Sequence, residues 1–289
     1  MSTPRRTTSR ARAGGPAGSP AAPALAGLAF DLDGTVYLGH VLLPGAAELI
    51  SALAAAGVPY LFATNNSSTS GVRYVQRLTE LGLPATRASV LTSNDVTVRH
   101  LRDAGLRRPF VIATGEVTEE YRAGGLEPTG LGPAGDEPDA VVLTFDTSLT
   151  YAKLRRAADL IRAGLPYIAT HPDLVCPTPT GPIPDCGAFA ALLFEATGRR
   201  PLVMGKPAPP MAAAICTRLR LVADAIAFVG DRLYTDVRMA RDHGFLAVLT
   251  LTGETSRGDL AASDDVPDLV VDDLAALHAY LRSVGSLPS

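Results

Sequence analysis

Short apolar runs alternate with amphipathic patterns along most of the chain, and the runs stop abruptly at small or polar residues. They cover residues 28–30, 59–62, 225–229, 246–251 and 268–271. Helical spacing extends over residues 44–56, 68–81, 209–219 and 235–243. Short continuous apolar runs are typical of strands that helices cover on both faces, as in a parallel sheet. The pattern therefore predicts βαβ units and a doubly wound, Rossmann-like α/β fold.

The polar residues that follow these runs are the candidates for a functional site. In an open parallel sheet, ligands bind outside the carboxyl ends of the strands. Asp31 and Asp231 each follow an apolar run, although they lie 200 positions apart in the sequence. The fold class therefore predicts that these carboxylates converge in one crevice.

The alternation is interrupted between residues 94 and 198. This stretch has apolar runs at 109–113, 140–145 and 166–170, and helical patterns at 94–104, 116–123, 149–163 and 187–197. About 100 residues of alternating elements suffice for a separate small domain. We expect a core domain made of residues 25–93 and 199–289, with a smaller α/β cap domain, residues 94–198, inserted between its halves.

Composition excludes several classes of protein. Hydrophobic residues make up 47% of the 289 residues and charged residues 19%, so the chain can bury a core and is not wholly disordered. No apolar run approaches the ~20 residues of a membrane-spanning helix. Residues 1–24 contain four arginines and no acid, and their composition predicts a disordered basic tail. Without this tail, 22 basic and 29 acidic side chains remain, which argues against a nucleic-acid-binding surface.

Cysteine usage and the N-terminus bear on the cellular compartment. Cys176, Cys186 and Cys216 form no CxxC pair and are odd in number, which indicates neither a disulfide framework nor a cysteine zinc site. Arg5 and Arg6 could begin a twin-arginine export signal, but no apolar segment follows them before the first predicted strand. We therefore expect a cytoplasmic protein with no membrane or nucleic-acid partner.

Two carboxylates follow the first predicted strand, in Asp31-Leu32-Asp33-Gly34-Thr35. Acids two positions apart at a strand end can address one small site, and Gly34 lets the backbone turn sharply. Crowded like charges resist joint ionisation, so a cation is needed to keep Asp31 anionic. Mg²⁺ suits this position because it is a hard ion that prefers oxygen ligands and phosphate. The alternatives are a plain Asp-Gly turn, or Asp33 as a helix N-cap.

A second polar cluster, Thr64, Asn65 and Asn66 followed by two serines, ends the second predicted strand. A hydroxyl and main-chain N–H groups at a helix N-terminus can cradle a phosphate. The alternative is an ordinary capping cluster that starts a helix at Ser68.

Lysine is scarce, because 24 of the 26 basic residues are arginine. A lysine in a motif of such a chain can mark a need for a compact ammonium group. Lys206, in a Gly-Lys-Pro segment, could neutralise a phosphate charge beside Asp31, or could be a surface lysine before an N1 proline. Asp231 and Asp236 follow the third core strand in the segment GDRLYTD. They suit a cation ligand and a supporting acid, and Asp236 could also cap the next helix.

In this order and at these strand ends, the four motifs resemble those of the haloacid dehalogenase (HAD) superfamily of phosphohydrolases. The resemblance spans residues 26–271 and includes LPGA at 43–46, TNNSS at 64–68, GKP at 205–207 and GDRLYTD at 230–236. The long insert resembles the larger cap of the NagD-like, 4-nitrophenylphosphatase and phosphoglycolate phosphatase branch.

The resemblance implies a Mg²⁺-dependent phosphatase of small phosphorylated metabolites. Asp31 would be the nucleophile that forms an aspartyl-phosphate, and Asp33 would protonate the leaving oxygen and then activate water. The implied phosphoryl-oxygen ligands are Thr64, Asn65, Asn66 and Lys206. The implied metal ligands are the Asp31 carboxylate, the Asp33 main-chain carbonyl and Asp231, with support from Asp236.

The cap departs from the family pattern. His171 stands where asparagine is frequent, and Asp185 lies in a Pro-Asp-Cys-Gly segment in place of the commoner Pro-Gly-x-Gly. Family caps contact substrate here, so the expected cap contacts are His171, Asp173, Cys176 and Asp185. The substrate stays open among sugar phosphates, phosphoglycolate, glycerol phosphate, pyridoxal phosphate and nucleotides. The resemblance also implies a homodimer formed through the cap.

Two other functions stay open. One is phosphoryl transfer to a sugar hydroxyl, as in a phosphomutase, although the large insert disfavours it. The other is a non-catalytic regulator that binds a phosphorylated ligand on a retained scaffold, which the intact Asp31 and Asp33 disfavour.

Overall fold

The computed structural model describes residues 25–132, 137–178 and 180–287, so the predicted basic tail at residues 1–24 lies outside the described residues. The larger sheet is built from β1 (Gly27–Phe30), β4 (Tyr60–Thr64), β5 (Val90–Thr92), β12 (Ile226–Gly230), β13 (Leu246–Thr250) and β14 (Leu269–Val271). All six strands are parallel, in the order β14-β13-β12-β1-β4-β5. The predicted parallel α/β core is therefore confirmed, and β5 is the one strand that the apolar runs missed.

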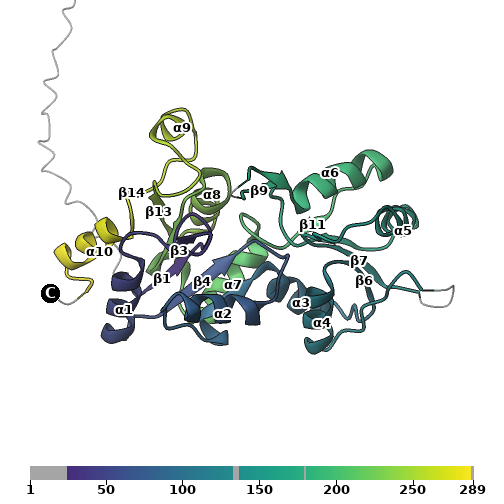
Figure 1. Cartoon of the computed structure of the whole chain (residues 1–289), viewed down its shortest axis with the longest axis horizontal. Helices are drawn as coiled ribbons and strands as arrows, with labels where there is room; N and C mark the ends of the chain where they lie inside the picture. The colour runs from purple at the N-terminus through teal and green to yellow at the C-terminus, as the bar shows by residue number, and fades with distance from the viewer. Residues whose placement is uncertain (1–24, 133–136, 179, 288–289) are drawn as a thin grey trace, which may run out of the picture.

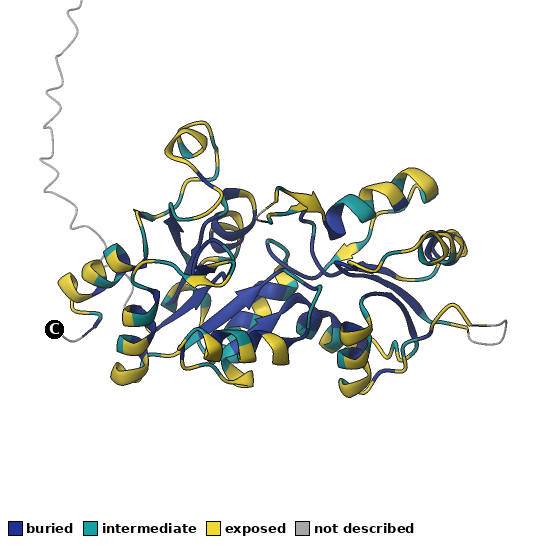
Figure 2. Ribbon diagram, in the orientation of Figure 1, coloured by how far each residue is buried: buried dark blue, intermediate teal, exposed yellow. Residues whose placement is uncertain are grey.

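Helices cover both faces of this sheet (Figures 1 and 2). One face carries α1 (Ala46–Ala56), α2 (Gly71–Glu80) and α10 (Leu274–Ser283), and the other carries α3 (Ser93–Asp103), α7 (Pro209–Leu219) and α8 (Arg238–His243). Side chains alternate along β1, so Phe30 packs in the cluster that contains Ile50 of α1, whereas Ala29 packs in the cluster that contains Met211 of α7. This two-sided burial explains why the strands have continuous apolar sequences.

The segment after β4 remains a loop up to residue 70, so the helix predicted to begin at Ser68 begins three residues later. The Asn66 side chain accepts hydrogen bonds from the main-chain N–H and the hydroxyl of Ser68, which closes a turn. Ser70 then caps α2 by accepting from the N–H of Arg73. The loop therefore leaves the polar residues after β4 at the sheet edge.

The inserted segment forms a smaller parallel sheet in the order β11-β8-β7-β6. Its strands are β6 (Pro109–Ile112), β7 (Ala140–Leu143), β8 (Tyr167–Ala169) and β11 (Leu202–Val203), with helices α4 (Gly115–Ala123), α5 (Tyr151–Arg162) and α6 (Cys186–Thr197). A short antiparallel pair, β9 (Val175–Cys176) and β10 (Ile183–Pro184), lies between β8 and α6 in the sequence. This confirms a smaller sheet beside the core, to the right in Figure 1.

The boundaries 93/94 and 198/199 stay a prediction. Strand β11 pairs with β8 of the smaller sheet, which favours moving the second boundary beyond Val203. A two-residue edge strand carries too little periodicity to be read from sequence.

The remaining elements are short. They are the hairpin β2 (Tyr37–Leu38) and β3 (Val41–Leu42), the 3₁₀ turns η1 (Arg87–Ser89) and η2 (Ala223–Ala225), the π-helical turn η3 (Leu233–Val237) and α9 (Arg257–Ala261). Within the described ranges, no helix has the length and apolar character needed to cross a membrane.

Candidate active site

Residues from three strand ends and one crossover meet at the carboxyl edge of the larger sheet. Asp31 follows β1, and its Oδ1 lies 2.5 Å from Nζ of Lys206. The same ammonium lies 2.8 Å from Oδ1 of Asp236. Asp31, Asp231 and Asp236 each offer a carboxylate oxygen within 4.8 Å of the others. The structure thus brings together four of the predicted residues, which come from opposite ends of the sequence.

Local geometry fixes Asp231 among these groups. The main-chain N–H of Glu254 donates to its Oδ2 at 2.7 Å, and the Thr35 hydroxyl donates to its Oδ1 at 3.4 Å. Only glycine fits at position 253, because a Cβ there would lie 2.0 Å from Asp231 Oδ2. Asp236 lies inside the π-helical turn η3, so it caps no helix and its carboxylate faces Lys206.

The acids of this cluster are buried and crowd one another. Burial raises the pKa of Asp31 to about 8; Lys206 opposes the shift, and Asp236 and Asp231 add to it. Burial, and then Asp236, raise the pKa of Asp231 to about 7. Although burial alone would lower the pKa of Lys206, Asp236 and Asp31 raise it above its ordinary value. One ammonium therefore leaves the three carboxylates with an excess of negative charge.

The excess charge and the ligand chemistry fit a hard divalent cation. Three converging carboxylates supply oxygen ligands of the kind that Mg²⁺ prefers. A cation among them would also offset the repulsion that raises the pKa values of Asp31 and Asp231. The Asp33 carboxylate is not part of this group.

Asp33 is held beside Asp31 by the β2–β3 hairpin. The Tyr37 hydroxyl donates to Asp33 Oδ2 at 3.3 Å, and the Arg77 guanidinium lies over the Tyr37 ring at 4.5 Å. Burial raises the pKa of Asp33, although Arg77 and Tyr37 oppose the shift. A carboxyl group with a raised pKa is suited to exchange a proton with a ligand.

The loop after β4 uses its side chains to join segments of the chain. Asn65 Oδ1 accepts from the Lys206 N–H at 2.8 Å, and its Nδ2 donates to the Lys206 carbonyl at 3.0 Å and to Asp173 Oδ1 at 3.1 Å. Thr64 Oγ1 accepts from the Asn66 N–H at 3.1 Å. The Asn65 side chain is thus already bonded, and a phosphate contact by this residue would come from its main chain.

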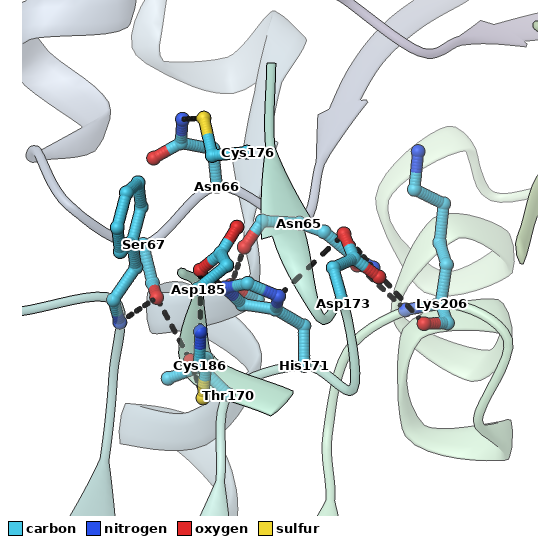
Figure 3. A network of polar contacts seen from close by, with 12 residues as sticks. Asn65, Asn66, Ser67, Thr170, His171, Asp173, Cys176, Asp185, Cys186 and Lys206 are labelled. Carbon is cyan, nitrogen blue, oxygen red and sulfur yellow. Dashed lines mark hydrogen bonds and ion pairs between the residues drawn. The ribbon is translucent and has the colours of Figure 1, made fainter. Parts of the chain in front are cut away.

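Three of the four cap residues expected to contact substrate, His171, Asp173 and Asp185, are linked by polar contacts, whereas Cys176 Sγ accepts from Asn66 Nδ2 at 3.9 Å (Figure 3). The His171 ring is fully buried, with Nδ1 at 3.5 Å from Asp173 Oδ2 and Nε2 at 3.5 Å from Asp185 Oδ1. Despite burial, contacts with His171 and Arg232 lower the pKa of Asp173, whereas burial raises that of Asp185. Burial, with Asp185, also raises the pKa of Cys176 to about 11, so this thiol stays protonated near neutral pH.

Core and cap residues together line a small cavity of about 40 Å³, which has room for a few water molecules. The predicted residues in its wall are Asp31, Asp33, Thr64, Asn65, Asn66, Asp173, Cys176, Asp185 and Lys206. His171, Asp231 and Asp236 are absent from the wall, and each contacts residues that form it.

Arg232 is a site residue that sequence reasoning missed. It lines the cavity, and its guanidinium lies 3.3 Å from Asp173 of the cap and 2.9 Å from Glu254. Its position directly after Asp231 is the one sequence feature that could have indicated a role in the site. Tyr37 was also missed, because nothing in a two-residue strand marks a hydroxyl that reaches Asp33.

Comparison with known proteins identifies the family. A profile of the haloacid dehalogenase-like hydrolases matches residues 28–127, and an HAD-hydrolase-like profile matches residues 203–277. A 5'-nucleotidase of Bacillus subtilis is 32% identical over 259 residues, which are 88% of this chain and 98% of that protein. The chain belongs to the haloacid dehalogenase-like hydrolases.

Solved HAD structures agree in fold over nearly the same span. A 4-nitrophenylphosphatase from Thermotoga maritima is 38% identical, with a TM-score of 0.83 over 88% of this chain and 97% of that one. A glycerol phosphate phosphatase from Mycobacterium tuberculosis, solved in complex with magnesium, is 35% identical, with a TM-score of 0.79 over 88% and 76%. The predicted branch of HAD phosphatases is therefore confirmed, and the enzyme class with it.

Proposed function

We propose that this HAD hydrolase is a Mg²⁺-dependent phosphatase that hydrolyses a small phosphomonoester through an aspartyl-phosphate on Asp31. The observation that carries the proposal is the contact of Asp31 with Lys206, inside a group of three buried acids at the carboxyl edge of the larger sheet. Magnesium-bound and phosphatase relatives of similar fold support it. Mg²⁺ would be held by Asp31, Asp231 and the Asp33 carbonyl, with support from Asp236, and would neutralise phosphate charge when bound.

The chain's own residues have separate roles in the two half-reactions. Asp31 attacks phosphorus, and Lys206 favours its anionic form together with the bound cation and neutralises a phosphoryl oxygen. Asp33, whose pKa burial raises, would give a proton to the leaving oxygen and then take one from the water that cleaves the aspartyl-phosphate. The hydroxyl of Tyr37 keeps the Asp33 carboxyl in place.

The cap would control access. A cavity of about 40 Å³ leaves little room for a leaving group, so we expect the contacts of Asp173 with Asn65 and Arg232 to separate on entry. Closure then excludes bulk water from Asp31.

The test is phosphate release from p-nitrophenyl phosphate and a metabolite panel, with Mg²⁺ and with EDTA. We expect release only with Mg²⁺, and none with Asp31→Asn. With ³²P-labelled substrate, acid-quenched wild-type enzyme should retain label that hydroxylamine removes, as for an acyl phosphate. Conversion to an isomeric phosphate without net release would instead indicate a mutase. An active Asp31→Asn variant would refute the assigned nucleophile.

We also propose a cytoplasmic setting and a homodimer formed through the cap. All three cysteines are unpaired, which suits a reducing compartment. Subcellular fractionation tests the first expectation, and light scattering on the purified chain tests the second.

A further inference from the structure

The cavity wall carries more negative than positive charge, and both of its cations are already paired with acids. Four carboxylates, those of Asp31, Asp33, Asp173 and Asp185, line it together with the two cations Lys206 and Arg232. Lys206 is paired within the cluster beneath the cavity, and Arg232 lies between one carboxylate of the cap and one of the core. The wall that faces a leaving group is therefore rich in hydrogen-bond acceptors.

The two cap carboxylates differ in what they already bind. Both Asp173 oxygens accept from Asn65, and its Oδ2 also meets Arg232 and His171. Asp185 uses Oδ1 for the Cys186 N–H at 2.6 Å and for the contact with His171. Within the described chain, no hydrogen bond reaches Asp185 Oδ2, so this oxygen keeps its full capacity to accept.

The surrounding fold keeps Asp185 at the cavity. The fully buried His171 ring lies between the two cap carboxylates, with one ring nitrogen 3.5 Å from each of them. The backbone just after Asp185 is also tightly packed, because a Cβ at Gly187 would lie 2.0 Å from the Pro172 carbonyl oxygen. Asp185 is only 3% exposed and lines the cavity from the cap side.

We infer that Asp185 accepts a hydrogen bond from a hydroxyl of the leaving group, so that the enzyme selects phosphomonoesters of polyols over those of hydroxy acids. The inference rests on the proposed phosphatase function and adds the chemical class of its substrate. The charges of a phosphate dianion and of Mg²⁺ would offset each other. The leaving group would then contact the rest of the cavity wall.

An anionic leaving group fits this wall poorly. A carboxylate would face Asp33, Asp173 and Asp185, and could reach Arg232 only by displacing an acid that already holds it. A hydroxyl group carries no net charge and can donate to Asp185.

The test compares kcat/KM for two substrates with one carbon skeleton. Glycerol 3-phosphate and 3-phosphoglycerate differ at the terminal carbon, which is a hydroxymethyl group in the first and a carboxylate in the second. A charge-assisted hydrogen bond and avoided repulsion predict at least about a tenfold preference for glycerol 3-phosphate.

Asp185→Asn removes the charge at nearly constant size, and should reduce the preference about tenfold. Glu195→Gln makes the same chemical change at an exposed site on α6 and should leave the preference as in wild type. His171→Asn should also reduce the preference, because Asp185 loses the ring that holds it. If Asp185→Asn fails to fold, the wild-type ratio of the two kcat/KM values still tests the substrate class, and His171→Asn still tests the role of Asp185.

The outcomes separate this inference from the proposed function. Failure to release phosphate from any substrate, including p-nitrophenyl phosphate, would refute the function itself. Hydrolysis of p-nitrophenyl phosphate with a preference for 3-phosphoglycerate would overturn the inferred substrate class alone. A polyol preference that Asp185→Asn leaves intact would overturn the role of Asp185.

Discussion

Replacing Asp31 with asparagine should abolish turnover and yet make the metal-free protein more stable. The variant keeps an oxygen that can accept from Lys206 and removes one of three crowded negative charges. Burial and its acidic neighbours raise the pKa of Asp31 to about 8, so its surroundings favour the neutral form even though Lys206 is in contact. The lost ion pair is therefore outweighed by the relief of burial and repulsion.

The magnitude follows from the pKa. One pKa unit corresponds to about 1.4 kcal/mol, so the rise in the pKa of Asp31 from 3.8 to about 8 opposes folding by up to ~5 kcal/mol at pH 7.5, where the unfolded side chain is ionised. Repulsion from Asp231 and Asp236 is only part of this shift, and the variant also loses the ion pair with Lys206. We therefore expect Asp31→Asn to raise the free energy of unfolding by about 2 kcal/mol. For a chain of this size, that is an increase in melting temperature of about 5 °C.

The sign of the pH dependence is fixed as well. Because the folded pKa is raised, Asp31 contributes stability at low pH that is lost as the pH rises toward 8. The gain from Asp31→Asn should thus be larger at pH 7.5 than at pH 5.5.

Calorimetric melting in EDTA measures the effect, and Asp242→Asn is the control, because that acid is exposed on α8 and should change stability by less than about 0.5 kcal/mol. Mg²⁺ in millimolar excess should stabilise wild type more than the variant, since the variant lacks a ligand. A variant that melts below wild type in EDTA would refute the reasoning about charge crowding.

Single changes elsewhere give three further outcomes. Burial raises the pKa of Glu120 to about 7, so its contribution to stability is present below pH 4.5 and is lost as the pH rises through about 7. Glu120→Gln should therefore raise the free energy of unfolding by about 1–2 kcal/mol at pH 8 and by much less at pH 5, as measured by urea denaturation; equal gains would contradict this. Gly253→Ala should weaken Mg²⁺ binding at least about tenfold in calorimetric titrations, because its methyl group would strike Asp231 Oδ2, whereas Gly258→Ala, whose methyl group meets only a side-chain oxygen at 3.6 Å, should not. Lys206→Met should lower kcat by about 10²–10³ and destabilise the metal-free protein by about 3–5 kcal/mol, since it leaves buried acids unpaired. Recovery of kcat by Lys206→Arg would show that charge alone suffices.

The sheet was predictable because burial on both faces leaves a strong mark in the sequence. β1 and β12 are continuous apolar runs, and helix α7 begins at the proline that its pattern indicated. β5 and β11 were not predictable, because strands of three and two residues have no readable period. Their identity depends on the neighbours with which they pair.

The site residues that directly follow a strand were predictable from the sequence. Those that belong to the site only through contacts between distant segments were not. Asp31 and Asp231 follow buried strands, so fold class alone brings them together. The link from Arg232 to Asp173 joins core and cap across 59 positions, and no local pattern encodes it. The same holds for Asn65, whose side chain is bonded to Lys206 and Asp173.

The position of Lys206 shows how the insertion and the site depend on each other. Main-chain bonds continue past β11, from the Met204 N–H to the Ala169 carbonyl and from the Gly205 N–H to the Thr170 carbonyl. These bonds carry the smaller sheet to the residue directly before Lys206, whose own N–H and carbonyl then bond to Asn65 of the core. Lys206 reaches Asp31, 175 positions earlier, because it lies where the smaller sheet ends and the core resumes. A core sequence without its insert would therefore lack the strand that sets this lysine, so the cap is part of the structure that positions the charge beside the nucleophile.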